Sequence, residues 1–306
     1  MTEIGLGLAA LGRPGYINLG HGTDVADPSV AGMERAACDV LDAAYAGGVR
    51  SFDAARSYGR AEAFLGAWLA RRGLAPDQVV VSSKWGYTYT AGWRVDAEQH
   101  EVKQLSVEQL RRQLAETCEL LGDHLRLYQI HSATLESGVL DDAAVLEELA
   151  ALRASGVRVG LSVTGPEQAA TIERALAAGG FDAVQATWNL HERGAAAALE
   201  RSHAAGLRVY IKEALANGRL TARGMVGSLD AVARERGVRA DQIALAAALA
   251  QPWADVVLSG ALTVAQLESN LGASDVVWDE AVATRLSGLV EDPAEYWKTR
   301  SALPWT

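Results

Sequence analysis

Residues 44–59 have the sequence AYAGGVRSFDAARSYG, and this stretch contains the unit from which the chain is built. A helical pattern ends at Gly47-Gly48, a short β-rich run follows in Arg50–Asp53, and a polar loop carrying Tyr58 comes next. Glycine is favoured just after a helix because it reaches the left-handed conformation without strain. The stretch therefore predicts a helix, a buried strand and a loop with polar side chains, in that order.

The same order repeats along the chain. We expect strands at residues 4–8, 50–53, 78–84, 125–131, 157–163, 183–187, 207–211 and 255–258. Helical patterns lie near residues 33–47, 60–72, 106–121, 142–154, 166–178, 194–205, 228–236, 240–249 and 264–271. Eight strand–helix units in 306 residues predict an α/β protein, a (β/α)8 TIM barrel in which residues 1–306 form a single domain.

A doubly wound sheet is the competing fold, because residues 5–10 (GLGLAA) match the GxGxxA dinucleotide-binding pattern. That pattern functions only where a helix begins at the glycines, so that its N-terminus faces a pyrophosphate. Gly12, Pro14, Gly15 and Pro28 follow, and no helix is expected before about residue 30. Residues 5–10 are better interpreted as the first barrel strand, leading into a long loop at the mouth of a pocket.

The composition excludes several classes of protein. A net charge of −10, from 28 basic and 38 acidic residues, argues against nucleic acid or an anionic membrane as a partner. The N-terminus lacks a signal-peptide pattern, and no apolar run reaches the ~20 residues of a membrane helix. Cys38 and Cys118 are isolated, and no motif has metal-ligand spacing. We expect a cytoplasmic protein without a metal, and its oligomeric state is open.

Polar residues stand where the predicted strands end. Asp53, Lys84 and His131 end the second, third and fourth strands, and Tyr58 lies on the loop after the second. Each alone has an ordinary explanation as a cap, a packing residue or a solvated strand end. The active site of a barrel lies at the carboxyl ends of its strands, so all four are expected to meet there.

Together these four side chains suit proton transfer to a carbonyl oxygen. The ammonium of Lys84 is expected to lower the pKa of the Tyr58 phenol, and Asp53 keeps that ammonium charged. A neutral His131 then orients the carbonyl. No side chain supplies a hydride, so the set indicates a nicotinamide cofactor.

At residues 44–59, 80–84 and 127–131 the chain resembles the aldo-keto reductase family. The resemblance implies a (β/α)8 barrel and NAD(P)(H)-dependent interconversion of an aldehyde, ketone or sugar carbonyl with an alcohol. It assigns Tyr58 as the general acid/base, Lys84 and Asp53 as the pair that tunes it, and His131 as the residue that orients the substrate.

The resemblance also implies residues that hold the cofactor, namely Ser162, Gln185, Lys212, Gly260, Gln266 and Asn270. Lys212 stands where many family members have an aromatic ring, and it is expected to contact the cofactor phosphates or to pair with Glu213. Residues 260–270 contain no Lys or Arg, the residues that usually hold the 2′-phosphate of NADP. NAD is therefore an alternative to NADP, with a relaxed or NAD-leaning preference.

Aromatic residues on the predicted loops indicate a pocket for a small-molecule carbonyl or alcohol with an apolar or ring face. They are Tyr16, Trp85, Tyr87, Trp93 and Trp188. Two other functions stay open. Lys212 or Lys84 would serve a lyase that forms a Schiff base, and a cofactor-binding regulatory barrel would show little turnover.

Overall fold

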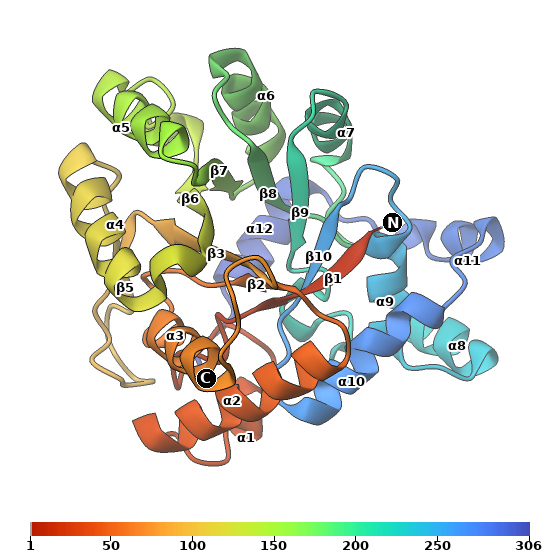
Figure 1. Ribbon diagram of the computed structural model, residues 1–306. Coiled ribbons are helices and arrows are strands. Elements are labelled where there is room, and N and C mark those ends of the chain that lie inside the picture. The colour runs from red at the N-terminus through yellow and green to blue at the C-terminus, as the bar shows by residue number, and fades with distance from the viewer. Residues whose placement is uncertain (1) are drawn as a thin grey trace.

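The computed structural model describes residues 2–306, so only Met1 of the predicted domain lies outside the described part. The central feature of the fold is a closed barrel of eight parallel strands (Figure 1). In their order around the barrel the strands are β1 (Glu3–Gly7), β2 (Ser51–Asp53), β3 (Val80–Trp85), β6 (Leu125–Ala133), β7 (Arg158–Val163), β8 (Ala183–Thr187), β9 (Arg208–Lys212) and β10 (Val256–Ser259). The (β/α)8 barrel is confirmed, and every predicted strand lies within two residues of an observed one.

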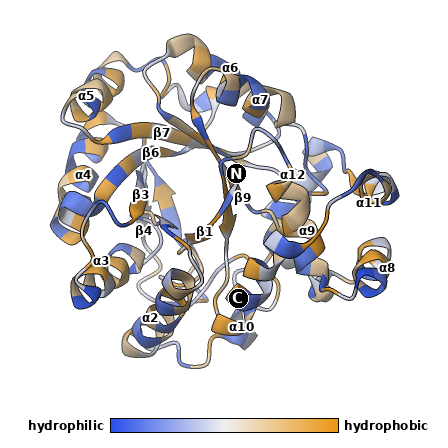
Figure 2. Cartoon of the chain, turned by 45° about the vertical axis from the view of Figure 1, so that its right-hand side comes forward, coloured by the Kyte–Doolittle hydropathy of each residue, from blue (hydrophilic) through white to orange (hydrophobic). Residues whose placement is uncertain are grey.

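Helices surround the barrel on its outer side (Figure 1). They are α2 (Val30–Ala46), α3 (Ala61–Arg72), α4 (Val107–Leu121), α5 (Ala143–Ala154), α6 (Gln168–Ala178), α7 (Ala196–Ala204), α8 (Gly227–Arg236), α9 (Ala240–Leu249) and α10 (Val264–Leu271). Hydrophilic and hydrophobic residues alternate along most of them, as amphipathic helices require (Figure 2). Helix α2 begins three residues before its predicted start, because Ser29 caps it by accepting a hydrogen bond from the backbone N–H of Gly32 at 3.0 Å.

The core has two parts. A large cluster joins the outer faces of the strands to the helices, and it includes the fully buried Leu41, Trp68 and Leu199. A second cluster consists of strand residues alone, from β6, β8, β9 and β10, as expected for side chains that pack across the barrel interior. Apolar packing thus fills the barrel and leaves the polar strand ends at one rim.

Several elements were not predicted from the sequence. An antiparallel hairpin, β4 (Tyr87–Tyr89) with β5 (Glu101–Lys103), follows β3 outside the barrel. Helices α1 (His21–Asp24), α11 (Glu280–Arg285) and α12 (Pro293–Ser301) are short. The chain then returns to the loop after β1, where Tyr16 and Thr306 exchange two backbone hydrogen bonds of 3.1 and 3.2 Å. These segments were missed because short strands and long-range loop contacts leave no periodic pattern.

Within residues 2–306, none of the helices combines the length and the apolar character that crossing a membrane requires.

Candidate active site

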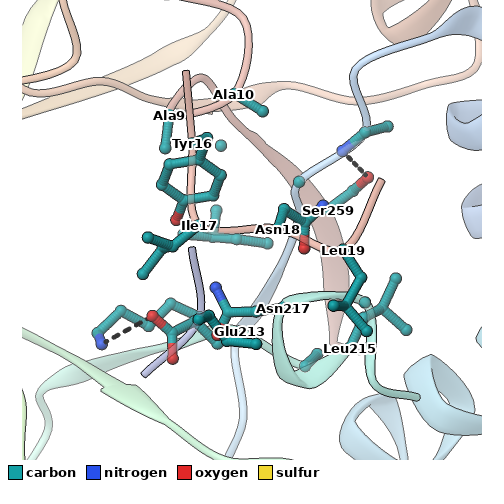
Figure 3. Close-up of a pocket in the computed structure, with 18 of the residues that line it drawn as sticks. Ala9, Ala10, Tyr16, Ile17, Asn18, Leu19, Glu213, Leu215, Asn217 and Ser259 are labelled. Carbon is teal, nitrogen blue, oxygen red and sulfur yellow. Dashed lines mark hydrogen bonds and ion pairs between the residues drawn. The ribbon is translucent and has the colours of Figure 1, made fainter. Parts of the chain in front are cut away.

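A cavity of about 740 Å³ opens at the carboxyl ends of the barrel strands. This volume lies in the range of small-molecule sites. The predicted site residues that line it are Tyr16, Asp53, Tyr58, Tyr87, His131, Gln185, Lys212, Gly260, Gln266 and Asn270. Figure 3 shows part of the wall, with Tyr16 on one side and Glu213 and Asn217 facing it. Lys84 lies beneath the cavity and is fully buried.

The register of the strands brings Lys84 to Asp53 and Tyr58. Asp53 ends β2 and is paired with Ser82 of β3, two residues before Lys84, so both side chains point to the same face. The Lys84 ammonium forms an ion pair with the Asp53 carboxylate and donates to Ala54 O at 3.0 Å. It also lies 3.4 Å from the Tyr58 hydroxyl oxygen. The phenol is therefore held next to a buried cation at the floor of the cavity.

The pKa of Tyr58 is shifted in the direction opposite to the sequence prediction. Burial raises this pKa well above its usual value, and the Asp53 carboxylate raises it further, while the Arg13 guanidinium opposes them. The prediction gave Asp53 only the role of keeping Lys84 charged, but Asp53 also compensates that charge, and burial disfavours a phenolate. Tyr58 thus carries its proton at neutral pH, which is the state that a proton donor requires.

His131 ends up as the neutral imidazole that the sequence predicted. Burial lowers its pKa well below the usual value, and the nearby cations Lys84 and Lys212 lower it further. Its Nδ1 lies 3.4 Å from the Ser57 hydroxyl, and its ring meets the Tyr58 ring edge-on at 5.4 Å between centroids. A neutral imidazole in this position can hydrogen-bond an oxygen that also reaches Tyr58.

Arg13 is a site residue that the sequence analysis missed. Its buried guanidinium lies 5.3 Å from the Tyr58 ring centroid and 4.8 Å from that of Trp305. It donates to Ser57 O at 2.9 Å and to the Glu101 carboxylate at 3.1 Å. The only signal was the position of Arg13 in the loop expected at the pocket mouth, since its hydrogen bonds are to residues 44 or more positions away.

Lys212, at the end of β9, belongs to a buried charged cluster. Its ammonium donates to the Thr187 hydroxyl at 2.9 Å and lies 3.9 Å from the Glu213 carboxylate. Arg300 of α12 binds the same carboxylate through Nε at 3.0 and 2.9 Å. Burial lowers the pKa of Lys212 to about 8 against the opposing charge of Glu213, and Arg300 lowers it as well. Of the two contacts predicted for Lys212, the structure contains the one with Glu213.

The side chains toward β8 and β10 fit a nicotinamide dinucleotide. Gln185 on β8 is buried and lines the cavity, and its Nε2 has no hydrogen-bond partner among the described residues, so it is free to bind a carboxamide. Near the end of β10, at the opposite end of the cavity from Gln185, the amide of Asn270 and the Ser259 hydroxyl are hydrogen-bonded at 2.8 Å. Gln266 donates to the Asp24 carboxylate at 2.7 Å. Gly260 also lines the cavity, and a Cβ added to it would meet no other atom within 4 Å.

Ser162 is placed differently from the prediction. Its side chain is buried below the cavity lining, and its Oγ accepts a hydrogen bond from the backbone N–H of Ser132 at 2.8 Å. The serine therefore supports the strand end after His131.

Three of the five predicted pocket aromatics, Trp85, Trp93 and Trp188, lie outside the cavity lining. Trp85 is fully buried because it follows Lys84 on β3, and successive strand residues point to opposite faces. Trp93 donates to Pro28 O at 2.7 Å, and Trp188 packs on the core residue Trp253. In their place Trp305 of the C-terminal tail lines the cavity beside Tyr16.

Across residues 2–306, no three His, Cys, Asp or Glu side chains are grouped so that they could hold a metal ion.

The comparisons with known proteins agree with this geometry. The model of the Aldo/keto reductase family matches residues 3–291, so the chain belongs to this family. The family relationship makes the chain an oxidoreductase that uses a nicotinamide cofactor and acts on small-molecule carbonyl compounds. A search of curated proteins found no match.

Solved structures of aldo-keto reductases share the fold. The holo form of one from Bacillus halodurans has a TM-score of 0.72 and 19% identity, covering 95% of this chain and 92% of that one. A protein from Pseudomonas aeruginosa described as an aldo-keto reductase has a TM-score of 0.65 and 23% identity, covering 89% of each chain. At these identities the likeness shows the fold alone.

Proposed function

We propose that this protein interconverts the carbonyl group of an aldehyde, ketone or sugar with the corresponding alcohol, and that Tyr58 is its general acid/base. One observation carries the proposal: Lys84 is ion-paired with Asp53 and lies 3.4 Å from the Tyr58 hydroxyl, which faces a cavity of about 740 Å³. This arrangement places a proton donor and a compensating cation where a carbonyl oxygen can bind.

A nicotinamide cofactor, when bound, supplies or accepts the hydride. Tyr58 donates its proton to the carbonyl oxygen as negative charge develops there. The phenolate that remains is stabilised by Lys84 and by the guanidinium of Arg13. His131, held neutral, donates a hydrogen bond to the carbonyl oxygen and so fixes it beside Tyr58. In alcohol oxidation the same residues act in reverse, so Tyr58 must first lose its proton.

The cofactor is assigned to Gln185 at its nicotinamide end and to Gly260, Gln266 and Asn270 at its adenosine end. Lys212 lies beside the nicotinamide end. Ser162 is assigned no contact with the cofactor, because its side chain supports the strand end after His131 through the hydrogen bond from Ser132.

We further propose that NADH is preferred over NADPH. Two arginines, Arg223 and Arg239, line the adenosine end, and both are paired with carboxylates. Arg223 binds Asp24 at 2.6 Å, and Arg239 binds Asp241 at 3.1 Å. Each carboxylate compensates the charge of its arginine, which leaves less of that charge to bind a 2′-phosphate, and a ribose hydroxyl can donate to the carboxylates. Dissociation constants for both reduced cofactors check the preference, and a hundredfold preference for NADPH would refute it.

The substrate is expected to combine an apolar or ring face with polar groups. Tyr16, Tyr87 and Trp305 offer aromatic faces, and the Arg13–Glu101 pair offers a donor and an acceptor in the same cavity. Aldehydes, cyclic ketones and aldoses all meet this description.

The test of the proposed function is the Tyr58→Phe variant. With a panel of aldehydes, ketones, aldoses and pyridoxal, and with all four nicotinamide cofactors, we expect the wild type to turn over and the variant to lose about a thousandfold in kcat. The Kd of the cofactor should stay within about twofold. Tyr89→Phe, in the hairpin outside the cavity lining, is the matched control.

Retained turnover in Tyr58→Phe would show that another group donates the proton. A wild type that binds a nicotinamide cofactor but oxidises it with no carbonyl would instead indicate a regulatory barrel.

One observation favours a second candidate, a lyase that forms a Schiff base. Lys212 lines the cavity and has a pKa lowered to about 8, so about a tenth of its amine is unprotonated at pH 7. Borohydride trapping of substrate on Lys212, without any change in nicotinamide absorbance, would support this function.

A further inference from the structure

We propose that Lys212 makes this protein discriminate between the two redox forms of its cofactor. The ammonium opposes binding of the positively charged pyridinium and leaves the neutral dihydropyridine favoured. The inference rests on the proposed function, because it requires a nicotinamide ring in the cavity beside Gln185 and Tyr58.

The strand register places Lys212 at the nicotinamide end of the cavity. In the pairing of β8 with β9, Gln185 lies opposite Tyr210 and Thr187 lies opposite Lys212. Alternate residues of a strand share a face, so Gln185, Thr187 and Lys212 all point into the barrel. Both Gln185 and Lys212 line the cavity. A ring whose carboxamide accepts from the unpartnered Gln185 Nε2 therefore lies within reach of the charge on Lys212.

The position of Lys212 is fixed by its neighbours. Glu213 adopts a left-handed backbone conformation, with φ of 55°, which is unfavourable for a residue other than glycine. Arg300 holds the Glu213 carboxylate, and the Asn189 side chain donates to the Glu213 carbonyl oxygen at 2.9 Å. The end of β9 is thereby constrained to keep Lys212 in the cavity. The ammonium makes one hydrogen bond among the described residues, to Thr187, although it has three donors.

The charges around Lys212 leave an excess positive charge. Glu213 on the same strand end supplies one carboxylate, against the two cations Lys212 and Arg300 of α12. Asp53 of β2 and Lys84 of β3 form a neutral pair, and His131 of β6 is uncharged.

The oxidised and reduced cofactors differ in charge only at the nicotinamide ring, so every other contact cancels in the ratio of their affinities. A unit charge a few ångströms away, at an effective dielectric constant of about 20, changes such a ratio by more than about tenfold. The protein is therefore expected to load the reduced cofactor and to release the oxidised one, which suits carbonyl reduction.

The experiment compares the Kd of NADH, from its fluorescence, with the Kd of NAD+, from calorimetry. At pH 7 we expect Lys212→Met to lower the ratio Kd(NAD+)/Kd(NADH) by about tenfold or more. Lys212→Arg keeps the cation and should keep the wild-type ratio. Lys298→Met, an exposed site on the outer part of α12, controls for the loss of one surface charge.

A pH series gives an independent measurement that needs no variant. The pKa of Lys212 is lowered to about 8, so the ammonium loses its charge as the pH rises above that value. Between pH 7 and 10 the wild-type ratio should fall toward that of Lys212→Met, whose own ratio should stay flat.

An unchanged ratio in a folded Lys212→Met variant, with both cofactors still bound, would overturn this inference and leave the proposed function intact. Should circular dichroism show that the variant is unfolded, a wild-type ratio that stays constant from pH 7 to 10 would overturn it equally. Failure of the wild type to bind any nicotinamide cofactor would overturn both proposals.

Discussion

Replacing Arg13 with methionine removes a buried cation beside the proposed proton donor. The guanidinium lies 5.3 Å from the centroid of the Tyr58 ring. At this distance, with an effective dielectric constant of about 20, one unit charge stabilises a phenolate by about 3 kcal/mol. Glu101, 3.1 Å from Arg13, cancels part of this effect. We therefore expect the pKa of Tyr58 to rise further in Arg13→Met.

Alcohol oxidation is the sensitive assay, because it requires Tyr58 without its proton. In a plot of log kcat/KM against pH, the rising limb for oxidation should move to higher pH in Arg13→Met. At a fixed pH below that limb the oxidation rate should fall by about 10- to 100-fold. Carbonyl reduction uses the protonated phenol and should change much less. Arg13→Lys retains a cation and serves as the matched control.

A second substitution tests the electrostatic origin of the effect. Adding Glu101→Gln to Arg13→Met removes the carboxylate that the first change leaves unpaired, so the limb should return part of the way to lower pH. The reasoning would be refuted by a limb that stays in place or moves to lower pH in Arg13→Met, with cofactor affinity and the circular dichroism spectrum unchanged.

Two further predictions concern the cofactor and the stability of the fold. Asp24→Asn removes the carboxylate that binds Arg223, so the Kd of NADPH should fall about tenfold relative to that of NADH; an unchanged ratio of the two constants would contradict the assignment of this end of the cavity. The pKa of Glu213 is lowered to about 2, despite its burial, by the charges of Arg300 and Lys212. The ionised Glu213 carboxylate therefore stabilises the fold above its ordinary pKa of 4.5, and this stabilisation is lost as the pH falls toward 2. In urea unfolding between pH 4.5 and 2, the free energy of unfolding of the wild type should fall by about 3 kcal/mol relative to that of Glu213→Gln. Parallel pH profiles of the two proteins would contradict this prediction.

The barrel could be predicted from the sequence because its signals are local. Apolar runs of strand length alternate with amphipathic helical stretches, glycines follow most of these helices, and each of these signals depends only on neighbouring residues. The rule that barrel sites lie at the carboxyl strand ends then brought Asp53, Lys84 and His131 into one region, and the structure places them there with Tyr58.

The hairpin β4–β5 and the C-terminal tail could not be predicted in this way. Three-residue strands carry no measurable period, and the tail reaches the loop after β1 only because the intervening chain has folded. The place of Trp305 in the cavity lining depends on this long-range contact, whereas Trp85, Trp93 and Trp188, which were predicted to line the pocket, lie outside its lining.

The sequence by itself determined the order of strands and helices, the family resemblance and the set of polar residues at the strand ends, because each of these depends on residues that are neighbours in the chain. Only the tertiary structure decided that Glu101, Tyr58 and Trp305 meet at Arg13, and that the Tyr58 phenol keeps its proton. The physical reason is that electrostatic energies depend on distance and burial, which residues remote in the chain create together.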